Sequence, residues 1–176
     1  MLGFIRAAGR GDDALLADLA RRLQAQGLRL SGAVQHNQAG PHSPCLHMDL
    51  RLLSPDHAGD PVIRISQMRG VEARGCRLDS DGLERAVGLI AADLARASAS
   101  RDLVVLNKFG KHEAEGGGLR PVIAQAIEAD LPVIIKVSAE AVPAFLDFVG
   151  DLAQELPHDG QSLFDWCLAQ VAARGG

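Results

Sequence analysis

Short apolar segments alternate with amphipathic segments along this chain, and this alternation most constrains its fold. Residues 102–106 and 132–137 are short, almost entirely apolar runs, which are typical of strands buried on both faces of a parallel sheet. Residues 15–23 and 78–97 instead carry apolar side chains at three- and four-residue spacing, which indicates helices. The pattern predicts an α/β domain in three layers, with helices on both faces of a mostly parallel sheet.

The remaining segments fit the same architecture. The chain has 176 residues, an ordinary length for one domain. We predict an inserted hairpin at about 45–67, formed by strands at 47–53 and 62–66. We also predict a loop at 35–44, an irregular segment at 69–77, further strands at 2–8 and 28–34, and helices at 119–129, 141–156 and 162–173.

Lysine is scarce and unevenly placed. Of the 18 basic residues, 15 are arginine, and the three lysines are Lys108, Lys111 and Lys136. The first 107 residues therefore lack the lysine of a phosphate-binding Gly-x-x-x-x-Gly-Lys-Ser/Thr loop, which usually lies near the N-terminus. The net charge of −4 and the absence of tyrosine argue against a nucleic-acid-binding surface, which is normally basic and stacks aromatic rings on bases.

The sequence predicts a cytoplasmic protein with no membrane span. No apolar run approaches the roughly 20 residues that a spanning helix needs, and charged residues interrupt any apolar segment near the N-terminus. The three cysteines are too few and too widely spaced for a disulfide framework. Cys45 and Cys76 either approach each other or are small buried residues. A metal site is not favoured, because no common zinc site has the spacing of His36, His42, Cys45 and His47.

The first candidate site is the loop Gly9-Arg10-Gly11-Asp12-Asp13, which follows the first predicted strand. In parallel sheets, ligands bind at the carboxyl ends of strands, where the N-termini of helices point. The glycines allow close approach of the backbone, and free N–H groups there could hold a phosphate. Asp12 and Asp13 would repel an anion unless a divalent cation lay between. The alternative is an ordinary turn in which Asp12 or Asp13 caps the following helix.

The second candidate site is the polar segment 107–118, which follows the most apolar predicted strand. Lys111 could neutralise a phosphate, and Glu113 or Glu115 could orient a water molecule or a metal ion. Asn107 and Lys108 open the segment and add polar groups at the same strand end. The alternative is a solvated turn with local charge pairs.

A basic stretch is the third candidate site. Guanidinium groups can grip an oxyanion through two parallel hydrogen bonds, so clustered arginines suit phosphate or a similar anion. The alternative is a solvated loop. The arginines of this stretch are Arg64, Arg69, Arg74 and Arg77.

Taken together, these residues resemble an uncharacterised bacterial family, domain of unknown function 2478. Members of that family look associated with molybdate transport genes, which implies a link to molybdenum or another oxyanion by association. The resemblance covers nearly the whole chain. It is carried by Gly-Asp-Asp-Ala-Leu-Leu-Ala-Asp-Leu-Ala (11–20), Leu-Ser-Gly-Ala-Val-Gln (30–35), Met-Asp-Leu-Arg-Leu-Leu (48–53), Ile-Arg-Ile-Ser-Gln (63–67), Arg-Gly-Cys-Arg-Leu-Asp (74–79) and Asn-Lys-Phe-Gly-Lys-His-Glu-Ala-Glu-Gly (107–116).

More distantly, the chain resembles the small P-loop nucleoside-triphosphatases of the cancer-related family. The segment 107–113 is similar to that family's Asp-Glu-Ile-Gly-Lys-Met-Glu motif and keeps Gly110, Lys111 and Glu113. Asn107 and Lys108 stand where the family has the acidic pair that binds magnesium and activates water. The segment Gly11-Asp12-Asp13 stands where the family's phosphate loop reads Gly-Lys-Thr.

The resemblance implies a P-loop NTPase-like fold, but the replaced residues remove most of the charge that stabilises phosphoryl transfer. Three functions stay open. The first is binding of a nucleotide or another phosphate ligand with weak or altered hydrolysis, with Mg²⁺ as the candidate cofactor. Lys111 would then stand in for the missing lysine, beside the arginines and residues 9–13.

The second function is binding or delivery of molybdate or tungstate by the arginines, and the third is a non-catalytic interaction module. A homodimer is also expected, because the C-terminal helix carries more apolar side chains than one core needs. They are Leu163, Phe164, Trp166, Leu168 and Val171.

Overall fold

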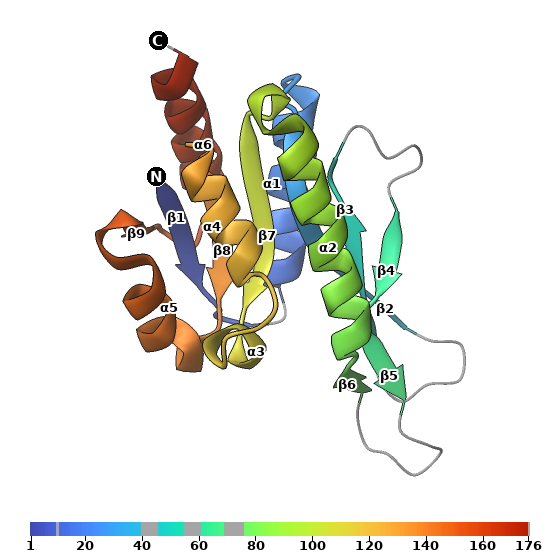
Figure 1. Ribbon diagram of the computed structural model, residues 1–176. Helices are drawn as coiled ribbons and strands as arrows, with labels where there is room; N and C mark the ends of the chain where they lie inside the picture. Colours follow the sequence, from blue (N-terminus) through green and yellow to red (C-terminus); the bar gives the residue numbers. More distant parts are fainter. Residues whose placement is uncertain (10, 40–45, 55–60, 69–75, 176) are drawn as a thin grey trace.

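Seven strands form one mixed sheet in the order β4-β3-β2-β7-β8-β1-β9 in the computed structural model (Figure 1). The structure describes residues 1–9, 11–39, 46–54, 61–68 and 76–175. The strands of the sheet are β1 (Leu2–Arg6), β2 (Leu30–Ala39), β3 (Leu46–Leu52), β4 (Val62–Arg64), β7 (Leu103–Phe109), β8 (Val133–Val137) and β9 (Ala153–Glu155). A separate two-stranded ribbon consists of β5 (Ser66–Met68) and β6 (Cys76–Leu78).

The five strands from β2 to β9 in this order run parallel, and β3 and β4 join the β2 edge as an antiparallel hairpin. This arrangement confirms the predicted α/β class with a mostly parallel sheet and an inserted hairpin. The helices are α1 (Asp12–Ala25), α2 (Ser80–Ala97), α3 (Lys111–Ala114), α4 (Arg120–Glu128), α5 (Val142–Val149) and α6 (Gly160–Gly175), with short 3₁₀ turns η1 (Ser98–Ser100), η2 (Ala139–Ala141) and η3 (Gly150–Leu152).

Two hydrophobic cores lie on the two faces of the sheet. On one face, apolar residues of α2, α4 and α5 pack against side chains such as Phe4, Leu106 and Ile135. On the other face, α1 and α6 pack against Ile5, Val105 and their neighbours. Because successive residues of a strand point to opposite faces, the central strands are apolar at nearly every position. The result is three layers, with α2 and α4 in front of the sheet and α1 behind it in Figure 1.

The predicted loop at 35–44 is partly wrong, because β2 continues to Ala39. Residues 33–39 pair in antiparallel register with β3, for example Gln35 with Leu50 and Gln38 with His47. The sequence of residues 35–39 is mostly polar and lacks the apolar alternation of a strand, so the pairing with β3 supplies the structure. Residues 40–44 lie outside the described part of the chain, as do residues 69–75 of the segment predicted to be irregular.

The predicted helix at 141–156 is also wrong in its second half. Helix α5 ends at Val149, and Gly150 follows with a φ of +57°, a left-handed conformation that favours glycine. The chain then turns into β9, which pairs in parallel with β1 from Leu2 to Phe4. This three-residue strand is polar, and it forms because it satisfies the backbone groups along the free edge of β1.

Candidate functional site

The loop between β1 and α1 holds a carboxylate of the protein itself. Asp12 Oδ2 accepts hydrogen bonds from the backbone N–H groups of Ala8 (2.8 Å) and Gly9 (3.1 Å). Asp12 is only 2% exposed, and no side chain caps the N-terminus of α1. The expectation that Asp12 caps its own helix is therefore wrong, because the side chain turns back onto the preceding loop. The Gly9 amide, a candidate for phosphate, thus binds a carboxylate together with the amide of Ala8.

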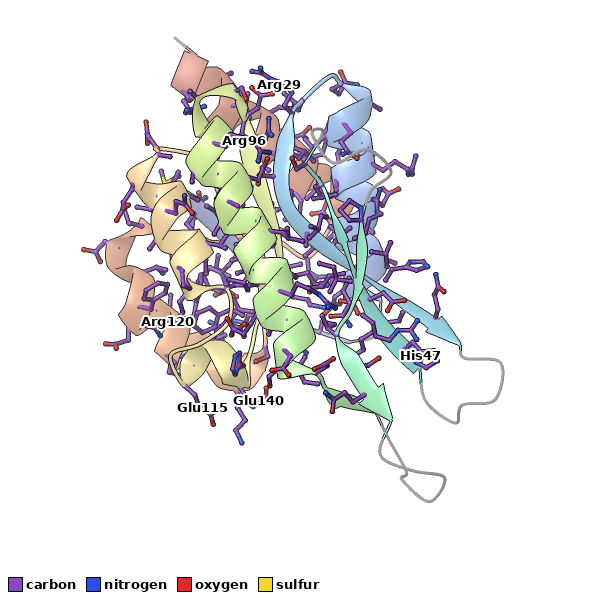
Figure 2. The ribbon with its side chains drawn as sticks, turned by 45° about the vertical axis from the view of Figure 1, so that its right-hand side comes forward. Arg29, His47, Arg96, Glu115, Arg120 and Glu140 are labelled. Carbon is purple, nitrogen blue, oxygen red and sulfur yellow. The ribbon has the colours of Figure 1, made fainter. Side chains whose placement is uncertain are left out.

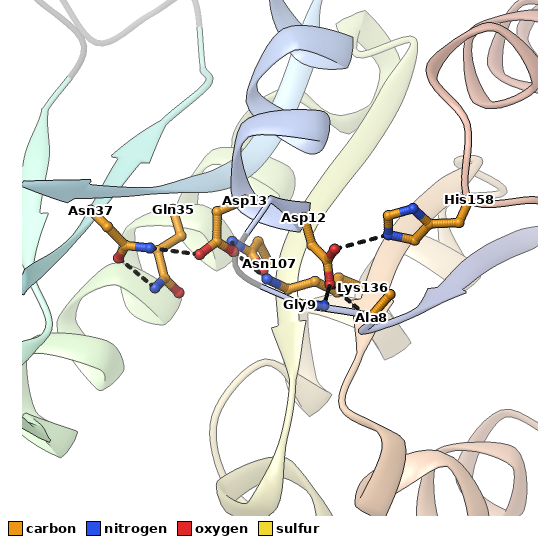
Figure 3. A network of polar contacts seen from close by, with 9 residues as sticks. All are labelled: Ala8, Gly9, Asp12, Asp13, Gln35, Asn37, Asn107, Lys136 and His158. Atoms are coloured by element: carbon orange, nitrogen blue, oxygen red, sulfur yellow. Dashed lines mark hydrogen bonds and ion pairs between the residues drawn. The ribbon is translucent and has the colours of Figure 1, made fainter.

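His158 contacts the other oxygen of the same carboxylate. Its Nε2 atom lies 2.9 Å from Asp12 Oδ1, and it comes from the segment between β9 and α6 (Figure 3). Burial acts to raise the pKa of Asp12, but the N–H groups of Gly9 and Ala8 and the charges of His158 and Lys136 outweigh it. The pKa of Asp12 consequently lies below its ordinary value, and the carboxylate is ionised at neutral pH.

Asp13 joins the carboxyl ends of three strands to the first turn of α1. Its carboxylate accepts hydrogen bonds from Lys136 of β8, from Asn107 of β7 (2.8 Å) and from Asn37 of β2 (2.7 Å). Gln35 in turn donates to Asn37 Oδ1 at 2.9 Å. Figure 3 shows these side chains in one row beside the Asp12 loop. The row is a polar network at the edge of the sheet where parallel α/β folds bind ligands.

Lys136 is the lysine that contacts this network, although the sequence motifs did not point to it. It is buried, and it forms an ion pair with Asp13. The signal that could have found it is a single charged residue at the carboxyl end of the apolar strand 133–137, beside the strand that precedes the loop. His158, Asn37 and Gln35 were missed as well, and nothing in their local sequence distinguishes them from surface residues.

Asn107 carries an unsatisfied oxygen. The residue is 3% exposed, and its Oδ1 atom is the one buried side-chain oxygen or nitrogen in the described part of the chain that has no hydrogen-bond partner. Its amide nitrogen donates to Asp13, so reversing the amide would place two oxygen atoms against each other. A buried polar atom without a partner is costly, and it indicates a place for a donor from a ligand or from water.

Glu113 does not have the role expected from the sequence. It is buried, and its two oxygens accept the backbone N–H groups of Gly110 (2.8 Å) and Leu119 (3.2 Å). These bonds hold α3 against the start of α4. The expectation that Glu113 orients a water molecule or a metal ion is therefore corrected, because both of its oxygens are committed to the backbone.

Lys111 and Glu115 are exposed on the surface. Lys111 begins α3, and Glu115 is the residue that follows this helix. Lys111 is 89% exposed, and its ammonium lies 3.7 Å from the Glu115 carboxylate, one helical turn away. Figure 2 shows Glu115 and Glu140 at one end of the molecule and Arg29 and Arg96 at the other. Lys108 is exposed on β7. The lysine that contacts the first turn of α1 is therefore Lys136, and the substitution of Lys111 for a phosphate-loop lysine has no contact to support it.

Arg64 is the member of the basic stretch whose side chain the structure describes, and it lies away from the loop after β1. Arg64 donates two hydrogen bonds to Asp49, at 2.8 and 3.2 Å. It lies on β4, five strand spacings from β1, which corresponds to about 24 Å. Arg77 lies in β6, and its side chain is outside the described part of the chain. The candidates Arg10, Arg69 and Arg74 are outside it as well, and so are His42 and Cys45.

The arrangement does not fit Mg²⁺. Both oxygens of Asp12 face hydrogen-bond donors, and the oxygens of Asp13 are shared between Lys136 and two asparagine amides. Mg²⁺ demands nearly octahedral oxygen ligands and would have to displace the ammonium group. Within the described ranges, no three His, Cys, Asp or Glu side chains form a group suited to a metal ion.

The apolar side chains of α6 belong to the core of the molecule. Leu163 and Cys167 are fully buried, and the half-buried apolar residues of this helix pack against the same cluster as α1. Burial raises the pKa of the Cys167 thiol to about 12, so this thiol is unreactive at neutral pH. The apolar residues of α6 therefore contribute to the core of one chain, and a homodimer stays a prediction.

A comparison with solved structures defines the fold. The solution structure of a human cancer-related nucleoside triphosphatase matches 98% of this chain and 96% of its own, with a TM-score of 0.63 and 13% sequence identity. That likeness shows the P-loop NTPase fold, as the sequence predicted. Residues 3–166 match the family described as "Protein of unknown function (DUF2478)", and the chain belongs to that family.

A longer relative is also similar. The "Molybdenum import ATP-binding protein ModC 2" of Bradyrhizobium diazoefficiens is 36% identical over 154 residues, which cover 88% of this chain. The matched part is 16% of the relative's length, so the chain corresponds to about one sixth of that protein. None of the helices in the described part of the chain is long and apolar enough to cross a membrane.

Proposed function

We propose that this protein is a degenerate P-loop protein, which binds a nucleotide or another phosphate ligand without ordinary magnesium-dependent hydrolysis. One observation carries the proposal: the amides of Ala8 and Gly9 in the loop after β1 hold an anionic group. Backbone N–H groups at this place in the fold are the part of a phosphate loop that recognises the anion. The buried, unsatisfied Asn107 oxygen beside them supports a ligand that also offers a hydrogen-bond donor.

Hydrolysis lacks its usual means of charge stabilisation. Asp12 and Asp13 occupy the positions that the resemblance assigns to the lysine and threonine of the phosphate loop, and Asn107 replaces an acidic residue. The one buried lysine at this edge, Lys136, is neutralised by Asp13. Phosphoryl transfer depends mainly on positive charge placed around the transferring group, so we propose binding with weak or no turnover.

We further propose that the protein serves a molybdenum import system. The support is the similarity to the molybdenum import ATP-binding protein, in which the matched segment is a small part of a longer chain. A partner protein of that system, or molybdate itself, would then be what the site responds to. Two amides that hold one carboxylate would also accept a tetrahedral oxyanion, so molybdate is the second candidate ligand.

Differential scanning fluorimetry and calorimetry test the proposal directly. The ligands are ATP, GTP, pyrophosphate, phosphate and molybdate, with sulfate as the control for general anion binding. We expect a concentration-dependent rise in Tm with a phosphate compound, because a ligand at a hundred times its Kd stabilises the folded state by about 2.7 kcal/mol. Stabilisation by molybdate alone would favour the second candidate. No shift with any phosphate compound or molybdate at millimolar concentration would overturn the proposal.

A matched pair of variants locates the binding. Arg64→Gln removes an arginine that lies about 24 Å from the loop, so we expect ligand binding to be unchanged. Asn107→Leu removes the unsatisfied oxygen together with the donor to Asp13, and we expect it to weaken the ligand response. Equal effects of the two changes would place the ligand elsewhere.

A further inference from the structure

We infer that the Asp12 carboxylate competes with the ligand for the loop after β1. It occupies the amides of Ala8 and Gly9, and a phosphate ligand binds there only by displacing it. This inference rests on the proposed function and concerns the regulation of the same site. The two N–H groups that Asp12 accepts, at 2.8 and 3.1 Å, are the donors that an incoming phosphate would need. One pair of amides cannot serve two anions at once.

The charges around the loop make simultaneous occupancy unfavourable. A phosphate at these amides would lie within contact distance of the Asp12 carboxylate and close to Asp13, two like charges in a largely buried setting. The basic side chains that face Asp12 are Lys136 and His158, which carries a charge only when protonated, and each is already committed, His158 to Asp12 and Lys136 to Asp13. The phosphate and Asp12 carry like charges and need the same two amides, so the phosphate displaces Asp12.

The unsatisfied oxygen of Asn107 shows that the closed arrangement is not complete. Its Oδ1 atom is buried beside Asp13 without a partner, although the amide nitrogen of the same side chain and the ammonium of Lys136 are both bonded to Asp13. A ligand that carries a hydroxyl or a protonated phosphate oxygen would supply the missing donor. The exchange therefore trades the bonds of Asp12 for bonds of the ligand and satisfies Asn107.

The exchange also reaches the C-terminal helix. The contact that joins His158 to α1 is its contact with Asp12, and His158 lies two residues before α6. Asp159 next to it accepts the N–H groups of Gln161 and Ser162 at the start of α6. Departure of Asp12 frees His158 and changes the surroundings of this helix start, so a partner that contacts α6 would sense whether the site is occupied.

The test compares pyrophosphate affinity in four proteins by calorimetry without added metal: the wild-type protein, Asp12→Asn, Asp12→Ala and Asp18→Asn. Asp18 is the control, because it is an exposed acidic residue of the same helix, where it pairs with Arg21. We expect Asp12→Ala to bind at least about tenfold more tightly than wild type, a difference of about 1.4 kcal/mol. Asp12→Asn should fall between them, because its amide oxygen still accepts from the loop, and Asp18→Asn should match wild type.

Amide NMR spectra supply a second readout at the loop itself. We expect pyrophosphate to shift the Ala8 and Gly9 N–H resonances, and the side-chain resonances of His158 to change in the wild-type protein alone. His158→Gln keeps Asp12 but removes its partner, and it should tighten binding by a smaller factor in the same direction. Urea unfolding of each variant confirms that the compared proteins are folded.

The outcomes separate this inference from the proposed function. If Asp12→Ala binds pyrophosphate as tightly as wild type or more weakly, the inference that Asp12 competes with the ligand is overturned, while the proposed function stands. Binding in the Asp12 variants alone supports the competition and overturns ligand binding by the natural protein. No binding in any of the four proteins overturns both.

Discussion

Two lysine–carboxylate pairs at the same edge of the sheet differ in their surroundings. Lys136 and Asp13 are nearly buried, whereas Lys111 and Glu115 are exposed. We expect Lys136→Met to lower the free energy of unfolding by about 3 kcal/mol, because it leaves a buried carboxylate without its cation. Lys111→Met should change it by less than about 0.5 kcal/mol, because water screens an exposed pair. Urea unfolding followed by circular dichroism measures both.

The double variant Lys136→Met/Asp13→Leu provides the control for that comparison. It removes both charges, so we expect it to recover part of the stability lost in Lys136→Met. A double variant less stable than either single variant would show that packing, rather than the unpaired charge, dominates at this position.

A second buried carboxylate makes stability depend on acid pH. Burial acts to raise the pKa of Asp93, but hydrogen bonds from Arg101 (2.6 Å), Ser54 (2.6 Å) and Ser31 (2.7 Å), with the charge of Arg101, leave the pKa below its ordinary value. A lowered pKa in the folded state contributes stability above the unfolded pKa of about 3.9, and that contribution is lost as the pH falls through the folded pKa.

We therefore expect the free energy of unfolding to fall below about pH 4, and Asp93→Asn to flatten that dependence. The variant should also be less stable at pH 7, because the buried ion pair of Arg101 with Asp93 is lost. Urea titrations at a series of pH values between 7 and 2 measure this. If the free energy of unfolding of Asp93→Asn falls at acid pH as it does in wild type, the pH dependence belongs to other carboxylates, among which Asp12 is the first candidate.

At the residue scale, the sequence indicated where the candidate site lies better than it indicated which residues form it. Residues 9–13 and Asn107 were candidates because they follow predicted parallel strands, and the structure brings Asn107 to Asp13. Lys136 and His158 are separated from their aspartate partners by 123 and 146 residues. Contacts at that separation arise from tertiary packing, so local patterns do not reveal them.

At the element scale, one glycine fixes how closely β2 approaches β7. Gly32 has a φ of +104°, and a Cβ atom there would lie 2.0 Å from the backbone oxygen of Val105. The neighbour is backbone in the middle of the sheet and cannot move aside. We expect Gly32→Ala to destabilise the protein by about 3 kcal/mol or more, since strained backbone and overpacking act together.

Gly88 in α2 is the matched control, because a Cβ there meets nothing within 4 Å. We expect Gly88→Ala to stabilise the protein by about 0.5–1 kcal/mol, since alanine favours a helix interior. Thermal unfolding of the two variants under one condition compares them. A loss in Gly88→Ala as large as that in Gly32→Ala would show that the expected clash is not the cause.

The elements that the sequence predicted best are those with a strong apolar period. Strands β7 and β8 and helix α2 were predicted from their own residues, because each buries enough apolar surface to form a recognisable pattern. Strand β9 (Ala-Gln-Glu) and the outer half of β2 are polar, and they exist because β1 and β3 offer unpaired backbone groups. A strand that forms to satisfy its neighbour leaves little trace in its own sequence.

At the scale of the whole molecule, the fold and the candidate site depend on different features of the sequence. The P-loop architecture follows from the order of apolar elements, and the chain keeps it with 13% identity to its structural relative. At the carboxyl edge of the sheet, the Asp13 carboxylate and the carboxamides of Asn37 and Asn107 form one polar network. In this scaffold the amides of the loop after β1 hold the Asp12 carboxylate, which His158 also contacts, and Lys136 pairs with Asp13.

These contacts predict how the whole protein responds to magnesium. We expect Mg²⁺ alone to give no binding signal with the ligand-free protein, because each carboxylate oxygen at the site is already paired with a donor. Calorimetry with the ion as titrant measures this. Release of phosphate from ATP, followed over hours, should not exceed the rate without protein. Magnesium-dependent turnover that Asp13→Asn abolishes would contradict this, since Asp13 would then act as a metal ligand rather than as the partner of Lys136.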